Sequence, residues 1–185
     1  AEQYNDYRAW NSMGQIYFEN GQIATARNCY NKALAIEPNN ANVNYNAALA
    51  AMADNDFAKA EQYFGKAAGA DANLSAAMGT MYTMKGDYAA AKKAYGASAT
   101  NNAAVQQILD EDYTAALQTL NKVQKPNATT AYLKAVVAAR TNDKASVYSN
   151  LKSGIVLDPA MKTRVQTDIE FSKFAEDAEF MAIVK

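Results

Sequence analysis

The side chains that most often carry enzyme chemistry are scarce in this chain. It has no histidine and a single cysteine, Cys29. General acid–base catalysis by imidazole, Ser–His and Cys–His nucleophile pairs and most zinc sites are therefore excluded. The remaining catalytic route would need two carboxylates converging in a pocket. The densest acidic run, residues 110–112, reads as an inter-helix turn and should be solvated, so we expect neither enzyme activity, nor a metal site, nor a cofactor.

Composition narrows the possible partners further. The net charge is −1 and the isoelectric point is near 5.5, and the lysines and arginines are spread along the chain. A basic stripe that could follow a phosphate backbone is absent, so we expect no nucleic acid binding. No run approaches the roughly 20 apolar residues that cross a bilayer, so direct membrane insertion is not expected. Cys29, without a histidine partner, is interpreted as a half-buried small hydrophobe.

Three columns of residues recur along the chain in the same phase. Two columns contain a small residue in each repeat and one contains a large residue, and in all three the successive members are 34, 31, 25 and 31 residues apart. Such periodicity is typical of arrays of helical hairpins, in which a small side chain on one helix seats a large one from the next. The columns are Ala26, Ala60, Ala91, Ala116 and Val147; Tyr30, Phe64, Tyr95, Leu120 and Leu151; and Gly14, Ala48, Gly79, Ala104 and Ala135.

The turns inside the hairpins carry a local signal of their own. Gly or Asn stands in the middle of four of the five turns, where a left-handed residue ends a helix. Asp follows in four of the five, where its carboxylate can cap the next helix. Capping explains these aspartates without a metal. The turns are residues 20–22, 54–56, 85–87, 110–112 and 141–143.

The first repeat resembles the tetratricopeptide repeat family. It has the family pattern nearly complete, with Met13 in place of the usual leucine: Trp10, Gly14, Tyr17, Ala26, Tyr30, Ala33 and Pro38. This resemblance implies an all-α, right-handed superhelix (an α-solenoid) of about five helical hairpins with a C-terminal capping helix. We expect one domain over residues 1–185. Its repeats would be approximately 7–40, 41–71, 72–101, a degenerate and clipped 102–127, and 128–159. Residues 160–174 would form the capping helix, and the last residues to 185 would join the cap.

The resemblance also implies which residues face the concave groove, because the first helix of each hairpin lines it in this family. The candidates for contact with a peptide are Arg8, Asn11, Gln15, Phe18, Asn42, Tyr45, Asn46, Leu49, Asn73, Thr80, Thr83, Tyr132 and Arg140. Members that bind chaperone C-termini use a clamp of asparagines with lysine and arginine. The cationic positions of that clamp are neutral here, so we reject this specific function.

We therefore expect a non-catalytic interaction scaffold whose groove of amides, hydroxyls and rings binds a protein partner as a peptide segment or a helix. The alternatives are a structural spacer or assembly element and a self-association module, which leaves a homo-oligomer possible. A weaker resemblance, in residues 131–142 and 178–182, is to the repeat region of some Gram-negative bacterial envelope proteins. It suggests the periplasmic side of the envelope, with the cytoplasm as the alternative, and we expect another domain to precede the first repeat as part of a larger bacterial protein or complex.

Overall fold

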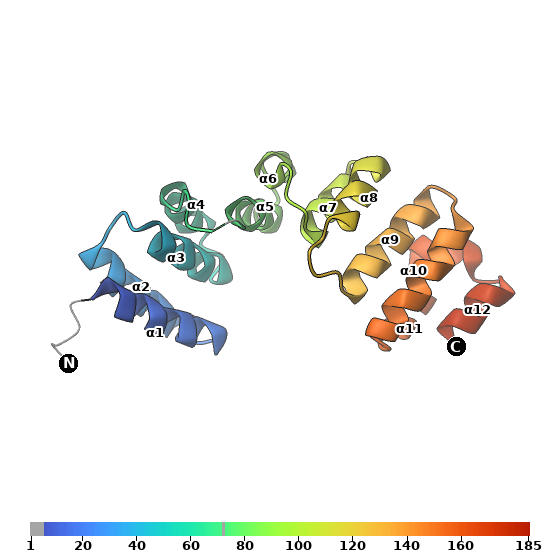
Figure 1. Cartoon of the computed structure of the whole chain (residues 1–185), viewed down its shortest axis with the longest axis horizontal. Coiled ribbons are helices and arrows are strands. Elements are labelled where there is room, and N and C mark those ends of the chain that lie inside the picture. The colour runs from blue at the N-terminus through green and yellow to red at the C-terminus, as the bar shows by residue number, and fades with distance from the viewer. Residues whose placement is uncertain (1–5, 72) are drawn as a thin grey trace. The chain divides into compact units, whose positions relative to one another are not determined.

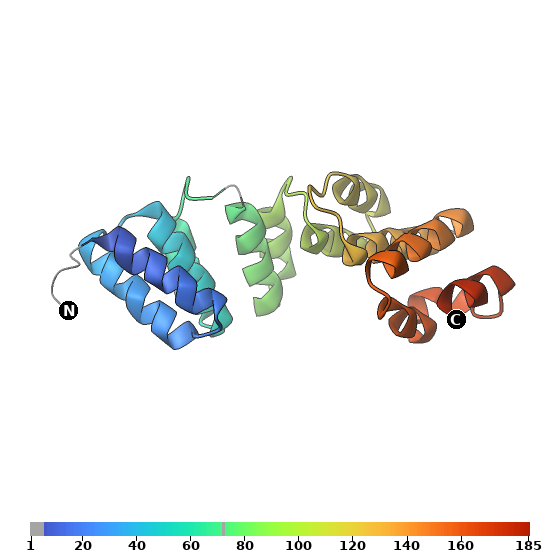
Figure 2. The same ribbon diagram turned by 60° about the horizontal axis from the view of Figure 1, so that its bottom comes forward.

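The computed structural model describes residues 6–71 and 73–185, and every regular element within them is helical. Two compact units divide the chain, Ala1–Gly96 and Ala97–Lys185. Unit 1 consists of helical hairpins, coloured blue to green in Figure 1: α1 (Tyr7–Glu19) with α2 (Ile23–Ile36), α3 (Ala41–Ala53) with α4 (Phe57–Lys66), and α5 (Leu74–Lys85) with α6 (Tyr88–Tyr95). Figure 2 shows α1 and α2 side by side along their whole length.

Unit 2 continues with the same hairpin pattern and ends in short helices. Its hairpins are α7 (Asn101–Leu109) with α8 (Tyr113–Asn121), and α9 (Ala128–Arg140) with α10 (Lys144–Leu157). The chain then forms α11 (Met161–Thr167), the 3₁₀ helix η1 (Ile169–Phe174) and α12 (Ala178–Val184). This arrangement confirms the predicted all-α solenoid of hairpins. That the two units act as one domain stays a prediction.

The three predicted columns form the core of the hairpins. Every member of the three columns is buried. The fit is closest where the small residue is glycine, because a Cβ added to Gly14 would lie 2.4 Å from the Tyr30 ring and one added to Gly79 would lie 2.4 Å from the Tyr95 ring. Where the small residue is alanine, the large partner is phenylalanine or leucine. The pairs are thus matched in size within each hairpin.

The turns adopt the predicted left-handed backbone. The central residue has a positive φ in all five turns. This includes Glu111, whose φ is 61° although glutamate does not favour positive φ. Asp56, Asp87, Asp112 and Asp143 each accept a hydrogen bond from the backbone N–H three residues on, at 3.0–3.2 Å. The capping prediction is confirmed for these four aspartates. In the first turn, Gln22 makes no such bond through its side chain.

The C-terminal cap differs from the single helix expected over residues 160–174. The helix stops at Asp168, which has extended backbone angles and whose carboxylate accepts the N–H of Glu170 at 3.0 Å. A side chain that caps a new helix ends the previous one, so the cap is divided into α11, η1 and α12. The buried rings of Phe171, Phe174 and Phe180 join it to the core of unit 2.

Two side chains link α1 and α2 at the surface of unit 1. The Lys32 ammonium lies 4.1 Å from the centroid of the Trp10 ring, which is partly buried. Such a cation–π contact contributes about 0.5–1 kcal/mol at exposed sites. Trp10 is the one tryptophan of the sequence.

Candidate functional site

An amide pair joins the first two hairpins of unit 1. Asn46 on α3 donates its side-chain N–H to the Asn11 carbonyl oxygen on α1, at 2.9 Å, and both residues are half-buried. Among the described residues, the Asn11 amide nitrogen and the Asn46 amide oxygen have no partner. The pair therefore presents one donor group and one acceptor group in fixed positions, which is the pattern that a peptide backbone can complete.

Apolar side chains lie on α3 around the same helix turns. Tyr45 packs edge-to-face on Phe64, with 6.0 Å between ring centroids and an interplanar angle of 62°. Burial, and to a smaller extent the charge of Asp71, raises the pKa of the Tyr45 hydroxyl. Leu49 is half-buried against the same core. These side chains are held by packing, so they can receive an apolar group with little loss of rotamer freedom.

We use the term amide surface for Asn11, Gln15, Asn42, Tyr45, Asn46 and Leu49 on α1 and α3. Gln15 and Asn42 are exposed, as are two other predicted groove residues, Arg8 and Asn73. Arg8 pairs with Asp6 at 2.9 Å, which lowers the pKa of that carboxyl. Phe18 is half-buried and packs against the core of the first hairpins instead of lying open.

The two predicted threonines are engaged in the packing of α5 against α6. The hydroxyls of Thr80 and Thr83 donate to the carbonyl oxygens of Ala76 and Gly79, each at 2.9 Å. The Tyr95 hydroxyl lies 3.2 Å from that of Thr83 and 3.4 Å from that of Thr80. Both threonines are half-buried, so they serve the hairpin more than an outside ligand.

In unit 2 the chain's own cap buries the predicted groove residue Tyr132 and pairs with the other one, Arg140, which stays exposed. Tyr132 is 6% exposed, its hydroxyl donates to the Asp168 carboxylate, and its ring meets Phe171 edge-to-face at 5.9 Å. Burial first, and then the bond to Asp168, raises the pKa of Tyr132 to about 12. Arg140 donates its Nε–H to Glu170 at 3.0 Å, and this pairing raises its pKa. We expected Tyr132 and Arg140 to line an open groove, whereas η1 packs on α9 at these residues.

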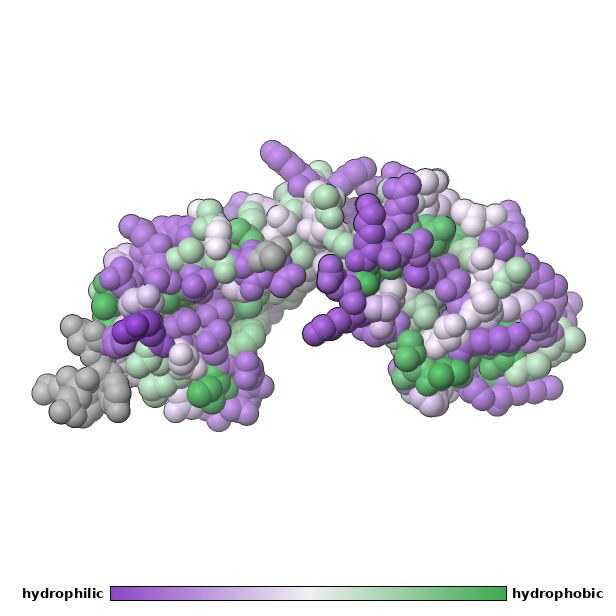
Figure 3. All heavy atoms as spheres, viewed as in Figure 1, coloured by the Kyte–Doolittle hydropathy of each residue, from purple (hydrophilic) through white to green (hydrophobic). Residues whose placement is uncertain are grey.

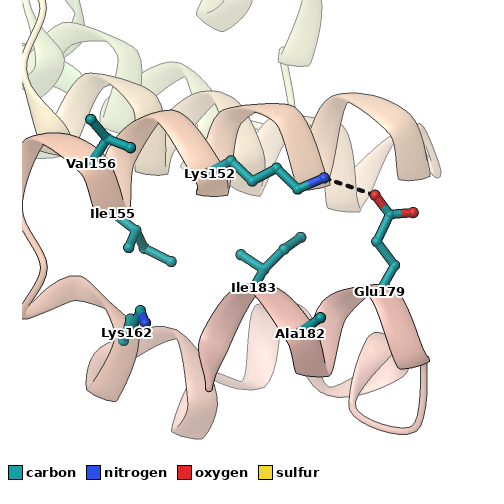
Figure 4. Close-up of a pocket in the computed structure, with 7 residues that line it drawn as sticks. All are labelled: Lys152, Ile155, Val156, Lys162, Glu179, Ala182 and Ile183. Carbon is teal, nitrogen blue, oxygen red and sulfur yellow. Dashed lines mark hydrogen bonds and ion pairs between the residues drawn. The ribbon is translucent and has the colours of Figure 1, made fainter.

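Several cavities lie in unit 2. One, of about 350 Å³, opens between α10 and the α11–α12 segment, and Figure 4 shows Ile155 and Ile183 pointing into it. Lys152 and Glu179 form an ion pair of 2.9 Å across its edge. Another, of about 220 Å³, lies between α7 and α9, and its lining includes Arg140 and Arg164. Arg164 was not among the site residues predicted from the sequence, because it lies in the segment that was expected to form the C-terminal cap.

Other kinds of site find no support in the described parts of the chain. Residues 6–71 and 73–185 contain no group of three or more cysteine, aspartate or glutamate side chains placed to hold a metal ion. None of their helices has the length and apolar character to span a membrane. Figure 3 shows polar and apolar residues interspersed on the visible face of each unit.

The hairpins and their surfaces define a helical-repeat protein. Residues 14–54 match the TPR repeat family and residues 41–74 match the tetratricopeptide repeat family. Residues 14–74 thus contain tetratricopeptide repeats, which confirms the resemblance predicted from the first repeat. No curated protein sequence matches it.

Two solved structures share the fold. A tetratricopeptide repeat protein from Parabacteroides merdae is 17% identical with a TM-score of 0.61, and the match covers 83% of this chain and 66% of that one. YrrB, described as a TPR protein with an unusual peptide-binding site, is 18% identical with a TM-score of 0.60, and the match covers 85% of this chain and 89% of YrrB. At these identities the likeness concerns the fold alone.

Proposed function

We propose that this chain is a non-catalytic scaffold that binds a peptide segment or a partner helix on the amide surface of unit 1. The observation that carries the proposal is the Asn11–Asn46 pair, which holds a donor and an acceptor in place beside Tyr45 and Leu49. Interaction with other proteins is the general role of this repeat family. The peptide-binding site named for YrrB is consistent with such a role on this fold.

The amide surface can bind a peptide backbone and one apolar side chain, with a moderate binding free energy. An amide donor and an amide acceptor can bind the C=O and N–H of an extended backbone, while Tyr45 and Leu49 contact one apolar side chain. Each hydrogen bond contributes about 1 kcal/mol net, so the pair contributes about 2 kcal/mol. Loss of both bonds alone corresponds to about a thirtyfold drop in affinity.

The test begins with selection of binders from a random peptide library on the intact protein. Binding of the selected peptides is then measured for a triple variant, Asn11→Ala, Tyr45→Ala and Asn46→Ala. We expect affinity to fall by about thirtyfold or more, with the far-ultraviolet circular dichroism spectrum preserved.

The matched control changes the same residue types outside the amide surface. Asn28, Asn31 and Tyr88 are exposed on second helices of their hairpins, and their replacement by alanine should leave binding unchanged. The proposal fails if a folded triple variant binds the selected peptides as tightly as the parent protein. Light scattering over a concentration range tests the alternative, in which exposed Met13 and Ile16 on α1 mediate self-association.

A further inference from the structure

The cavity between α7 and α9 in unit 2 is lined by both apolar and charged side chains. Its apolar lining residues come from α7 and α9, and its charged lining residues come from α9, α11 and η1. Leu109, on the wall formed by α7, is 59% exposed. The volume of about 220 Å³ is of the order of one large side chain. We call it the arginine cavity; the residues used below are Val105, Leu109, Val136, Arg140, Arg164 and Glu170.

The two arginines that line the cavity differ in their partners. Arg140 donates hydrogen bonds to both carboxylate oxygens of Glu170. The Arg164 guanidinium lies over the Tyr132 ring, 4.1 Å from its centroid, and forms no ion pair in residues 6–71 and 73–185. The neighbouring Asp168 carboxylate is bound by the Tyr132 hydroxyl and by the N–H of Glu170.

Stacking on a ring leaves the edge of a guanidinium available. The N–H groups of arginine lie in its plane, so Arg164 can rest on Tyr132 and still donate two parallel hydrogen bonds to a carboxylate. The ring contact also restricts the guanidinium, which reduces the entropy lost when an anion binds. Arg164 is therefore a positioned cation beside an apolar cavity.

The chain itself indicates the kind of segment that this face of α9 binds. At Asp168 and in the first turn of η1, carboxylates and apolar side chains alternate over residues 168–171. The two carboxylates are held by Tyr132 and Arg140, and the Phe171 ring packs on Tyr132. The inner face of α9 thus already holds an acidic and apolar stretch, and the arginine cavity next to it has the same two features.

We propose that the arginine cavity binds an acidic peptide, with a bulky apolar side chain inside the cavity and an adjacent carboxylate on Arg164. Val105, Leu109 and Val136 surround the apolar group, and Arg164 pairs with the carboxylate. The carboxylate belongs either to an aspartate or glutamate side chain or to the end of the peptide, since both present the same planar anion. This site lies in unit 2 and is independent of the amide surface of unit 1.

The experiment is a titration of the intact, ¹⁵N-labelled protein with three short acetylated peptides followed by NMR. The first contains leucine followed by glutamate and ends in an amide. The second ends in leucine with a free carboxylate. The third contains leucine followed by glutamine and ends in an amide. We expect one or both of the acidic peptides to shift the amide signals of α7 and α9, the neutral peptide to bind more weakly, and the difference to shrink at high salt.

Variants assign the binding to the cavity. Arg164→Gln should weaken the acidic peptide by about tenfold, because one charge-assisted contact is lost. Leu109→Ala should weaken all the peptides that bind, while the exposed Lys122→Gln in the same unit should leave affinity unchanged. Both Arg164 and Lys122 are exposed, so neither change should disturb folding, which circular dichroism checks.

The outcomes separate this proposal from the function proposed for unit 1. It is overturned if neither acidic peptide binds at millimolar concentration, if the neutral peptide binds equally well, or if Arg164→Gln leaves affinity within twofold. The triple alanine variant of the amide surface should retain binding of the acidic peptides. If that variant no longer binds the library peptides but still binds the acidic peptides, the result supports both sites.

Discussion

The contact between Gly14 and Tyr30 allows the repeat packing to be tested at one atom. A methyl group at Gly14 would lie 2.4, 2.7 and 2.9 Å from three atoms of the Tyr30 ring. Carbon atoms in contact prefer separations of about 3.5–4.0 Å, so the ring would have to move by about 1 Å. Tyr30 is 2% exposed and packs with the buried residues Ala26, Ala47 and Ala50, which leave it little room.

We expect Gly14→Ala to destabilise unit 1 by about 1–2 kcal/mol. Overpacking a filled core costs about 1–3 kcal/mol, and the better helix propensity of alanine returns up to about 1 kcal/mol. The free energy of unfolding is measured by urea denaturation followed by circular dichroism. Gly65→Ala on α4 is the matched control, because a methyl group there meets no atom within 4 Å. It should be neutral or stabilising by up to about 1 kcal/mol.

A compensating change sharpens the test. Unit 2 pairs Ala104 with Leu120, and Ala135 with Leu151, so Tyr30→Leu should make room for the methyl group of Gly14→Ala. The cost of the double variant should then be smaller than the sum of the single costs by about 0.5–3 kcal/mol. Equal stability of Gly14→Ala and the parent protein, or strict additivity in the double variant, would refute the size-matching argument.

Three further expectations concern other parts of the core and cap. Thr130 is 1% exposed, and its hydroxyl bonds to α7 and to the start of α9, so Thr130→Val should cost about 1–3 kcal/mol in thermal unfolding. Asp177 has a pKa of about 2, mainly because Lys144 pairs with it. Since its unfolded pKa is about 3.9, its stabilisation is complete above that value and is lost as pH falls towards 2. Hydrogen exchange in α12, corrected for intrinsic rates, should therefore be faster at pH 2.5 than at pH 6, and less pH-dependent in Lys144→Gln. Burial raises the pKa of the Cys29 thiol, so a thiol reagent at pH 8 should react slowly until urea unfolds the chain.

The hairpins could be predicted from sequence because their signals are local and repeated. On the second helix of each hairpin a small and a large residue stand four positions apart. The small residue of the first helix precedes them at a fixed spacing with the turn residues in between, so the pattern is visible without knowledge of tertiary contacts. Glu111 shows that the hairpin geometry can override the preference of a single residue. Its φ is 61°, in the left-handed region that the turn requires, although glutamate disfavours this region. The first helix of the fourth repeat, α7, begins at Asn101, next to residue 102, where that repeat was expected to begin.

The arrangement of the cap and of α9 could not be predicted in the same way. The contacts of Asp168 with Tyr132 and of Glu170 with Arg140 join residues more than 29 positions apart. The sequence of a short amphipathic segment does not show whether its aspartate and glutamate side chains face solvent or pair with an arginine. The predicted groove residue Tyr132 is therefore buried under the cap, and the pairing of the exposed Arg140 with Glu170 was not expected. The meeting of Asn11 with Asn46 likewise depends on how successive hairpins pack.

The solitary indole at the start of the chain makes the protein convenient for optical measurements. Trp10 belongs to unit 1, and its emission responds to the nearby Lys32 ammonium and to the opening of the first hairpin. Circular dichroism, by contrast, reports the helices of both units. Heating one sample while recording both signals compares the melting of the first hairpins with that of the whole chain, without any attached dye.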